Sequence, residues 1–439
     1  MSDGGTAHAI RVAVDLTLLQ PGGQNGGVKP FIFAYVGWLS RQREVPLTLI
    51  FLTRRNSHAD VRALARPQDE LVCLLDDNSG GPVLSDLHFP RESFQPHASL
   101  GLLRRLRIDL LYCPLGVCTR SEPGVPTIAT VVDVLHRDYP MTLTSADVAY
   151  RETVFAEMMA KADLIQGISR HTLDRVEHHY RFPHERTFCS PIAIHHRLVE
   201  RPARTLRLPE QPYFLFPANA WKHKNHEGLL LAFRLYRHQP DSHWHLVLTG
   251  HNDESMRSVL ALAATLGVAQ AVHYYGHLDE QDFACLWQKA GALVFPSLHE
   301  GFGIPLVEAM GFGLPIVSSN AGALPEVGGD ACLYVDATKP VDLAEAMGRI
   351  ARDDALRVQL RSRGRARLSE FSFLRDARAF LSRIVTCVRQ GARPTHRGFY
   401  SDGWTAPEAA ASIPSATGAR ELVIESCPMP ENRTVYLVF

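Results

Sequence analysis

Short apolar runs alternate with helix-like stretches along most of the chain, and this alternation constrains the fold more than any other feature. The strand-like runs of the first half lie at Ile10–Asp15, Leu47–Leu52, Ile108–Cys113 and Thr127–Val132. A second series lies at Tyr213–Phe216, Trp244–Gly250, His273–Gly276 and Gly291–Phe295. Strands that alternate with helices form parallel sheets from βαβ units. The sequence therefore predicts an α/β fold with two such sheets.

The length of the chain points to more than one domain. Its 439 residues exceed what a single hydrophobic core usually supports, and 46% hydrophobic with 21% charged residues suits globular packing. The charged, proline-containing segment Val199–Pro209 is the best linker candidate. We therefore expect domains at residues 1–200 and 201–390, followed by a tail at 391–439 with strand-like pieces at Glu421–Glu425 and Thr434–Phe439.

Composition excludes several classes of protein. No run approaches the roughly 18 apolar residues of a membrane span, and Met1–Gly5 lacks the basic start of a signal peptide, so we expect a cytoplasmic protein. The formal charge is zero, which argues against nucleic acid as a partner. Leu102–Arg107 could form a basic amphipathic face that touches the inner membrane surface, although a solvated helix face is the better explanation.

The run Pro296–Met310 carries the clearest chemical signal. After the strand ending at Phe295, Glu300-Gly-Phe-Gly303 can turn sharply, and Pro305 suits the start of a helix. The free N–H groups of such a loop and the helix dipole stabilise a phosphate or partial negative charge. Glu300 and Glu308 would repel a diphosphate, so they fit better as acceptors of hydrogen bonds from sugar and ribose hydroxyls. The pattern predicts a nucleotide-sugar site.

This run, with its continuation through Gly311–Ser319 and Ala323–Asp336, strongly resembles the signature of the family 4 retaining glycosyltransferases. That family has the GT-B fold, in which two Rossmann-like, doubly wound domains face a central cleft. The resemblance implies that Glu300 is catalytic and holds the transferred sugar, while Glu308 holds the ribose. The donor-binding candidates that it implies in this stretch are Gly301, Phe302, Gly303, Ile304 and Glu308.

A second segment, Pro217–His226, resembles the diphosphate-binding segment of the family, in which an Arg precedes a Lys-Asn pair by five residues. Lys224 and Asn225 match the pair, so Lys224 is expected to be catalytic and to neutralise the leaving diphosphate. Asn219 stands in place of the Arg and is carried over only as a donor contact, while Lys222 could supply the missing charge. Gly250, which precedes an acidic stretch, resembles the loop that frames the nucleotide base.

Two further segments resemble the N-terminal half of the family. The loop Gly22–Gly27 matches its glycine loop, which makes Gly26 and Gly27 donor-binding candidates. Asp133 matches the Asp of a His-Asp pair and is a catalytic candidate, but Val132 occupies the place of the histidine. His136 could reach the cleft instead, or it could be a core histidine. Ser169 matches a serine near the interdomain face, with a helix N-cap as the alternative.

These features predict a retaining transferase that moves a hexose from a nucleoside-diphosphate sugar to a saccharide or lipid-linked acceptor. No Asp-x-Asp triplet occurs, so we expect neither a metal nor another cofactor. The motif His223-Lys-Asn-His226 resembles the corresponding segment of mannosyltransferases and favours GDP-mannose as the donor. Asn219 and Val132 leave open a catalytically weak sugar-nucleotide sensor or scaffold. A nucleotide-sugar epimerase, the other alternative, is disfavoured because the spacing of Glu300 and Glu308 is intact.

Overall fold

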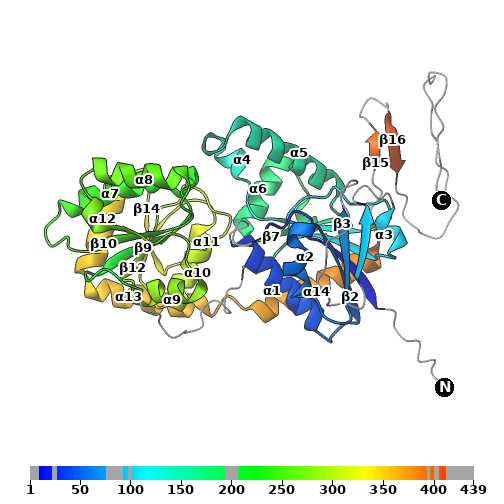
Figure 1. Cartoon of the computed structure of the whole chain (residues 1–439), viewed down its shortest axis with the longest axis horizontal. Helices are drawn as coiled ribbons and strands as arrows, with labels where there is room; N and C mark the ends of the chain where they lie inside the picture. Colours follow the sequence, from blue (N-terminus) through cyan, green and yellow to red (C-terminus); the bar gives the residue numbers. More distant parts are fainter. Residues whose placement is uncertain are drawn as a thin grey trace.

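The computed structural model describes residues 9–21, 27–75, 92–96, 101–192, 206–392, 396–399 and 405–411. These residues form two lobes that lie side by side, each built on a parallel sheet with helices packed on it (Figure 1). The α/β architecture with two parallel sheets is confirmed. Most strands of the two parallel sheets are buried along their centres, as expected when helices cover a parallel sheet.

The first sheet has eight strands in the order β4-β3-β2-β1-β5-β6-β7-β8, and each neighbouring pair is parallel. Its strands are β1 (Ile10–Asp15), β2 (Leu47–Thr53), β3 (Glu70–Leu75), β4 (Glu92–Pro96), β5 (Leu110–Cys113), β6 (Thr127–Val131), β7 (Leu164–Gly167) and β8 (Thr187–Cys189). The four strands predicted for this half are confirmed. Because β1 pairs with both β2 and β5, the strand order reverses direction between β1 and β5.

Helices of the first lobe follow the same alternation. They are α1 (Val28–Arg41), α2 (Arg55–Arg62), α3 (Leu102–Arg105), α4 (Leu135–Asp138), α5 (Ser145–Lys161) and α6 (Arg170–Tyr180), with 3-10 turns η1 (Pro140–Thr142) and η2 (His184–Arg186). In α3, Leu102 and Leu103 are buried in the core of this lobe. The apolar side of the segment therefore faces the protein, which favours the solvated-face interpretation over membrane contact.

The second sheet has six strands in the order β11-β10-β9-β12-β13-β14, again all parallel. The strands are β9 (Tyr213–Pro217), β10 (His245–Thr249), β11 (Val272–Tyr274), β12 (Ala292–Phe295), β13 (Ile316–Ser319) and β14 (Cys332–Val335). Its helices are α7 (His226–Arg237), α8 (Glu254–Thr265), α9 (Glu280–Lys289), α10 (Ile304–Gly311), α11 (Leu324–Gly328), α12 (Pro340–Arg352) and α13 (Asp354–Leu368), with turns η4 (Lys222–Lys224) and η5 (Ala269–Ala271). This order reverses between β9 and β12.

The last long helix, α14 (Phe373–Gln390), returns to the first lobe (Figure 1). Its Phe380 packs against Tyr112 of β5 and Phe188 of β8, with ring centroids 4.9 Å and 5.8 Å away. Ser372 caps the start of this helix, since its side chain accepts a hydrogen bond from the Arg375 amide. The expected domain boundaries at residues 200 and 390 stay predictions.

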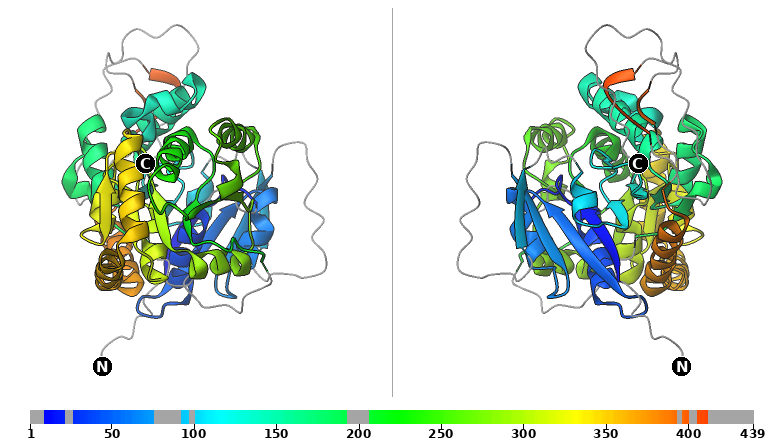
Figure 2. Two further views of the ribbon diagram at one scale, coloured as in Figure 1. Left: turned by 90° about the vertical axis from the view of Figure 1, so that its left-hand side faces the viewer. Right: turned by 90° about the vertical axis from the view of Figure 1, so that its right-hand side faces the viewer.

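Beyond α14, β15 (His396–Phe399) pairs with β16 (Thr405–Ala411) in an antiparallel hairpin that lies apart from both parallel sheets (Figures 1 and 2). The strand-like pieces expected at 421–425 and 434–439 lie outside the described residues. In the described part of the chain, no helix has the length and apolar character needed to cross a membrane.

Candidate functional site

Strand order places the predicted site. In open parallel sheets, ligands bind at the carboxyl ends of the strands where the order reverses. In the second sheet this point lies between β9 and β12, and the loops that leave these two strands carry Lys224 and Glu300. Two residues 76 positions apart in sequence therefore meet, with the Lys224 Nζ 2.5 Å from Glu300 Oε1.

The turn that carries Lys224 is fixed by its neighbours. Asn225 adopts a left-handed conformation (φ 62°), and its Nδ2 donates to the carbonyls of Pro296 and Ala337 at 3.2 Å and 2.9 Å. The Leu298 amide donates to the carbonyl of His223 at 2.7 Å. The lysine turn and the Glu300 loop are therefore bonded to each other through the backbone, and the ion pair has a defined geometry. Both side chains are mostly buried, 14% and 12% exposed.

The glycines after Glu300 are required by close packing. A Cβ atom built on Gly301 would lie 1.8 Å from the carbonyl oxygen of Val132, in the other lobe. Gly303 has φ 95° and directly precedes α10, and a Cβ atom there would lie 2.4 Å from the Leu324 side chain. The loop thus runs directly against the first lobe, and only glycine permits this approach.

The remaining candidates of the signature take different places. Glu308 is 4% exposed on α10. The Phe302 side chain is 3% exposed and packs edge-on against Phe371, so a donor contact at this residue would have to come from its main chain. Ile304 lies against Gly27 of the first lobe, where a Cβ would be 2.3 Å from its Cδ1. Gly26 lies outside the described residues.

Asn219 has a structural partner that its sequence position does not reveal. Its Oδ1 accepts a hydrogen bond from the amide of His251 at 2.9 Å. Gly250, between them in space, has φ 135°, and a Cβ there would lie 2.7 Å from the Ala218 carbonyl. Asn219 and Gly250 thus join the ends of β9 and β10. Lys222 is exposed at the start of the 3-10 turn, and a phosphate contact by either residue stays a prediction.

Asp133 reaches the same region from the first lobe. It follows β6, its Cβ lies 3.2 Å from the position of a Cβ on Gly301, and its Oδ1 accepts from the Leu135 amide (3.0 Å) and from Arg151 Nη1 (3.2 Å). His136 points elsewhere. It is 1% exposed, its ring packs on Phe155, and its Nε2 lies 2.6 Å from the Tyr180 hydroxyl. His136 is therefore the core histidine of the two alternatives.

Two histidines beside the ion pair, the half-buried His223 and the buried His299, were not predicted. Burial lowers the pKa of His223 to about 4, and the charge of Lys224 acts in the same direction. Burial also lowers the pKa of His299, against the opposing effect of Asp133 and Asp138. His299 is 5% exposed and its Nδ1 lies 3.8 Å from Asp138 Oδ2 in the first lobe. Position 299 inside the signature was the only sequence signal for it. Both shifts favour the neutral form of the imidazole.

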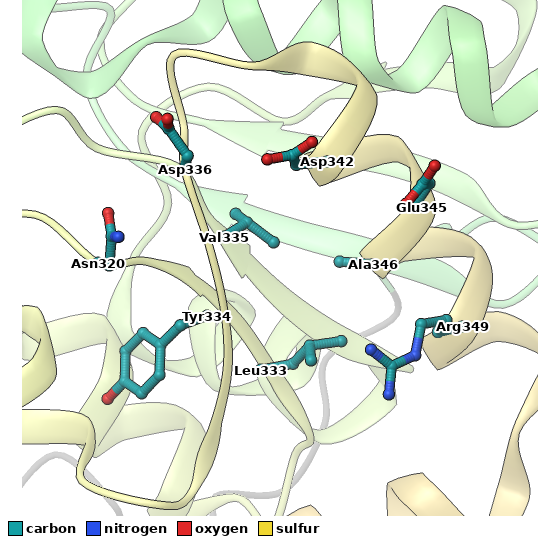
Figure 3. A pocket seen from close by; sticks show the side chains of 9 residues that line it. All are labelled: Asn320, Leu333, Tyr334, Val335, Asp336, Asp342, Glu345, Ala346 and Arg349. Carbon is teal, nitrogen blue, oxygen red and sulfur yellow. The ribbon is translucent and has the colours of Figure 1, made fainter.

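A cavity of about 290 Å³ lies elsewhere, between β14 and α12 at the edge of the second sheet (Figure 3). Acidic side chains of Asp336, Asp342 and Glu345 line one side, and Arg349 lies near the other. None of the predicted site residues lines it. The chemistry predicted from the sequence therefore concentrates at the Lys224–Glu300 pair and not in this cavity.

Comparisons with known proteins agree with this geometry. Residues 200–367 match the family model of the glycosyl transferases group 1. The chain is 30% identical to the O-antigen chain mannosyltransferase B of Escherichia coli over 234 residues, which are 52% of this chain and 61% of that protein. It is 29% identical to the O-antigen chain mannosyltransferase RfbU of Salmonella typhimurium over 127 residues, 29% of this chain and 35% of that protein. The chain thus covers less than two thirds of either relative.

Solved structures resemble the fold over most of the chain. Sucrose-phosphate synthase from Thermosynechococcus elongatus superposes with a TM-score of 0.63 at 19% identity, covering 86% of this chain and 99% of that one. Anabaena Alr3699/HepE in complex with UDP-glucose gives a TM-score of 0.62 at 14% identity, covering 86% and 100%. At these identities the likeness shows the fold alone, and it confirms the GT-B architecture.

Proposed function

We propose that the chain is a retaining glycosyltransferase, because residues 200–367 match the family model of the glycosyl transferases group 1 and the fold is GT-B. Its donor would be a nucleoside-diphosphate hexose, with GDP-mannose favoured by the mannosyltransferase relatives. Its acceptor would be a saccharide or a lipid-linked saccharide of a polysaccharide such as O antigen. The cytoplasm as the place of action stays a prediction.

The observation that carries the proposal is the contact between Lys224 and Glu300 at the reversal point of the second sheet. Without a donor, the ammonium and the carboxylate neutralise each other at 2.5 Å. A nucleotide sugar offers each of them a better-matched partner, since the diphosphate can take the ammonium and the sugar hydroxyls can donate to the carboxylate. The two residues of this ion pair would then bind the two groups joined by the glycosidic bond that breaks, with Lys224 on the diphosphate and Glu300 on the sugar.

The transfer itself needs little covalent participation by the protein. An acceptor hydroxyl oxygen forms the new bond to the anomeric carbon on the face from which the diphosphate oxygen leaves, and its proton passes to a phosphate oxygen. Lys224 would stabilise the charge that grows on the leaving diphosphate. Glu300 and the amides of residues 301–303 would orient the sugar. Glu308, buried on the first turns of α10, would accept hydrogen bonds from the ribose.

A catalytically weak sensor remains the second candidate, because Asn219 uses its Oδ1 for the His251 amide and offers no positive charge. Binding without turnover would distinguish it. The epimerase alternative loses its basis, since residues 200–367 match the glycosyltransferase family.

A thermal-shift screen against GDP-, UDP- and dTDP-hexoses tests the proposal directly. A ligand at 100 times its dissociation constant stabilises the folded state by about 2.7 kcal/mol, so the cognate donor should raise the melting temperature while the other nucleotides do so less. Loss of the donor over time must then follow in the presence of an acceptor mixture. A chain that no nucleotide sugar stabilises would contradict the proposal, and stabilisation without turnover would favour the sensor.

A further inference from the structure

One carboxylate of the second lobe reaches across to the first lobe. Glu326 lies on α11, and α11 and α6 lie on facing sides of the two lobes (Figure 1). Its Oε1 accepts from the amide of Arg170 and its Oε2 accepts from the amide of His171, both at 2.8 Å. These two amides belong to the first turn of α6, 156 and 155 residues earlier in the chain.

The chemistry of this contact is well matched. The first N–H groups of a helix have no partner within the helix, and the helix dipole makes this end positive. Ser169 Oγ accepts from the Thr172 amide at 3.0 Å, which satisfies the next N–H of the turn. The carboxylate of Glu326 satisfies the two N–H groups before Thr172, those of Arg170 and His171, with one oxygen for each. Charge-assisted bonds of this kind are about twice as strong as neutral ones.

The same contact is linked to the donor loop. Thr172 Oγ1 donates to the carbonyl of Gly301 at 3.2 Å, so α6 holds the loop that follows Glu300. On the other side of the loop, the Ala323 amide donates to the carbonyl of Glu300 at 2.9 Å, just before α11 begins. Arg367 of α13 donates from its Nη2 to the main-chain carbonyl of Glu326 and fixes α11 in turn.

We propose that Glu326 is a positioning residue that sets the closure of the two lobes. Its contact with α6 holds the Glu300–Gly303 loop against Val132 and Asp133. The second lobe, which would bind the donor, is thereby placed correctly against the first lobe, which would bind the acceptor. Nucleotide binding, for which most of the candidate residues lie in the second lobe, does not need this contact. Transfer does need it, because the acceptor must meet the anomeric carbon. The turnover arm of the test below rests on the proposed function, whereas the scattering arm does not.

Small-angle X-ray scattering of the full chain tests closure without any ligand. Glu326→Gln keeps the size of the side chain but replaces one accepting oxygen by an NH2 group that faces a backbone N–H. We expect the wild type to scatter as the arrangement in Figure 1 and Glu326→Gln to show a larger radius of gyration. Glu345→Gln, an exposed residue of α12, is the matched control and should scatter as the wild type. Superimposable curves for wild type and Glu326→Gln would overturn the proposal.

Kinetics separate positioning from general damage. Glu326→Gln should lower kcat for transfer by roughly tenfold to a hundredfold, because loss of one charge-assisted hydrogen bond shifts the equilibrium between open and closed lobes by that factor. The calorimetric Kd for the free nucleotide should stay unchanged. Thr172→Val, which removes the hydroxyl that holds Gly301, should act in the same direction, and Thr172→Ser should restore the rate. An unchanged kcat in both Glu326→Gln and Thr172→Val, or a parallel loss of nucleotide affinity, would overturn the assignment. If the wild type turns over no nucleotide sugar, the proposed function fails, and the scattering comparison still decides the role of Glu326.

Discussion

Removal of the Lys224 ammonium gives the sharpest test of the site. Charge on the diphosphate grows as the glycosidic bond breaks, so Lys224→Ala should lower the transfer rate more than it lowers donor affinity. Loss of one preorganised group of this kind typically costs on the order of 10²–10³ in rate. The structure adds a second effect, because Glu300 then loses its cationic partner in a site where its side chain is only 12% exposed.

The size of that second effect follows from burial. Unit charges 2.5 Å apart attract by roughly 7 kcal/mol at an effective dielectric constant of 20, most of which desolvation offsets. Breaking a fully buried pair costs about 3–5 kcal/mol, and an exposed pair contributes about 0–1 kcal/mol. For this pair we expect a loss of unfolding free energy of about 1–3 kcal/mol. The double variant Lys224→Ala/Glu300→Gln should recover most of that stability and none of the activity.

The assay combines denaturant unfolding with single-turnover transfer at saturating donor, with EDTA present so that no metal substitutes for the ammonium. Lys289→Ala is the control, since Lys289 is an exposed lysine at the end of α9, just before the amino end of β12. A fully active Lys224→Ala enzyme would refute the role of Lys224. A double variant as unstable as the single one would refute the reasoning about the unpaired carboxylate.

Three further predictions concern single residues. Glu308→Ala should weaken nucleotide binding by roughly 1.5–3 kcal/mol through lost charge-assisted hydrogen bonds, and an unchanged calorimetric Kd would remove Glu308 from the site. Asn219→Arg should lower the unfolding free energy by about 1 kcal/mol, because the hydrogen bond to the His251 amide is lost. Asn219→Asp keeps an accepting oxygen and should be as stable as the wild type. An Asn219→Arg protein as stable as the wild type would refute this. Burial lowers the pKa of His226 to about 4, so the unfolded chain takes up its proton near pH 6.5 and the folded chain only near pH 4. The contribution of His226 to the unfolding free energy is therefore fully present above pH 6.5, and roughly 2–3 kcal/mol is lost as the pH falls toward 4. His226→Phe should make the unfolding free energy depend less on pH in this range. Curves of unfolding free energy against pH that run parallel for the variant and the wild type would contradict this.

The sequence was sufficient wherever the physics is local. A buried strand, a glycine turn and a proline-started helix follow each other within residues 291–311, so the position of Glu300 at a strand end could be predicted. The four predicted strands of each sheet are present, but β3, β4, β7 and β8 of the first sheet are not among them, and β13 and β14 were covered only by the family resemblance of residues 311–319 and 323–336.

What the sequence could not provide depends on contacts between distant segments. The His251 amide, which donates a hydrogen bond to Asn219, belongs to a residue 32 positions away in the sequence. A comparison of motifs therefore shows only that Asn219 replaces an Arg. His136 was ambiguous until α5 and α6 enclosed it, since a histidine after a strand can face either a ligand or the core. The bonds of Glu326 to α6 join two lobes whose relative placement no local pattern encodes. Burial of His223 and His299 has the same origin.

The stereochemistry of donor breakdown tests the central claim most directly. The donor identified by the thermal screen, an α-linked nucleoside-diphosphate hexose, is incubated with the enzyme and EDTA, with water as the acceptor, and proton NMR records the first hexose released before mutarotation. A retaining, metal-independent site at Lys224 and Glu300 predicts that the α-anomer appears first and that Lys224→Ala slows its release. Initial release of the β-anomer, or breakdown that occurs only when a divalent metal is added, would contradict the account.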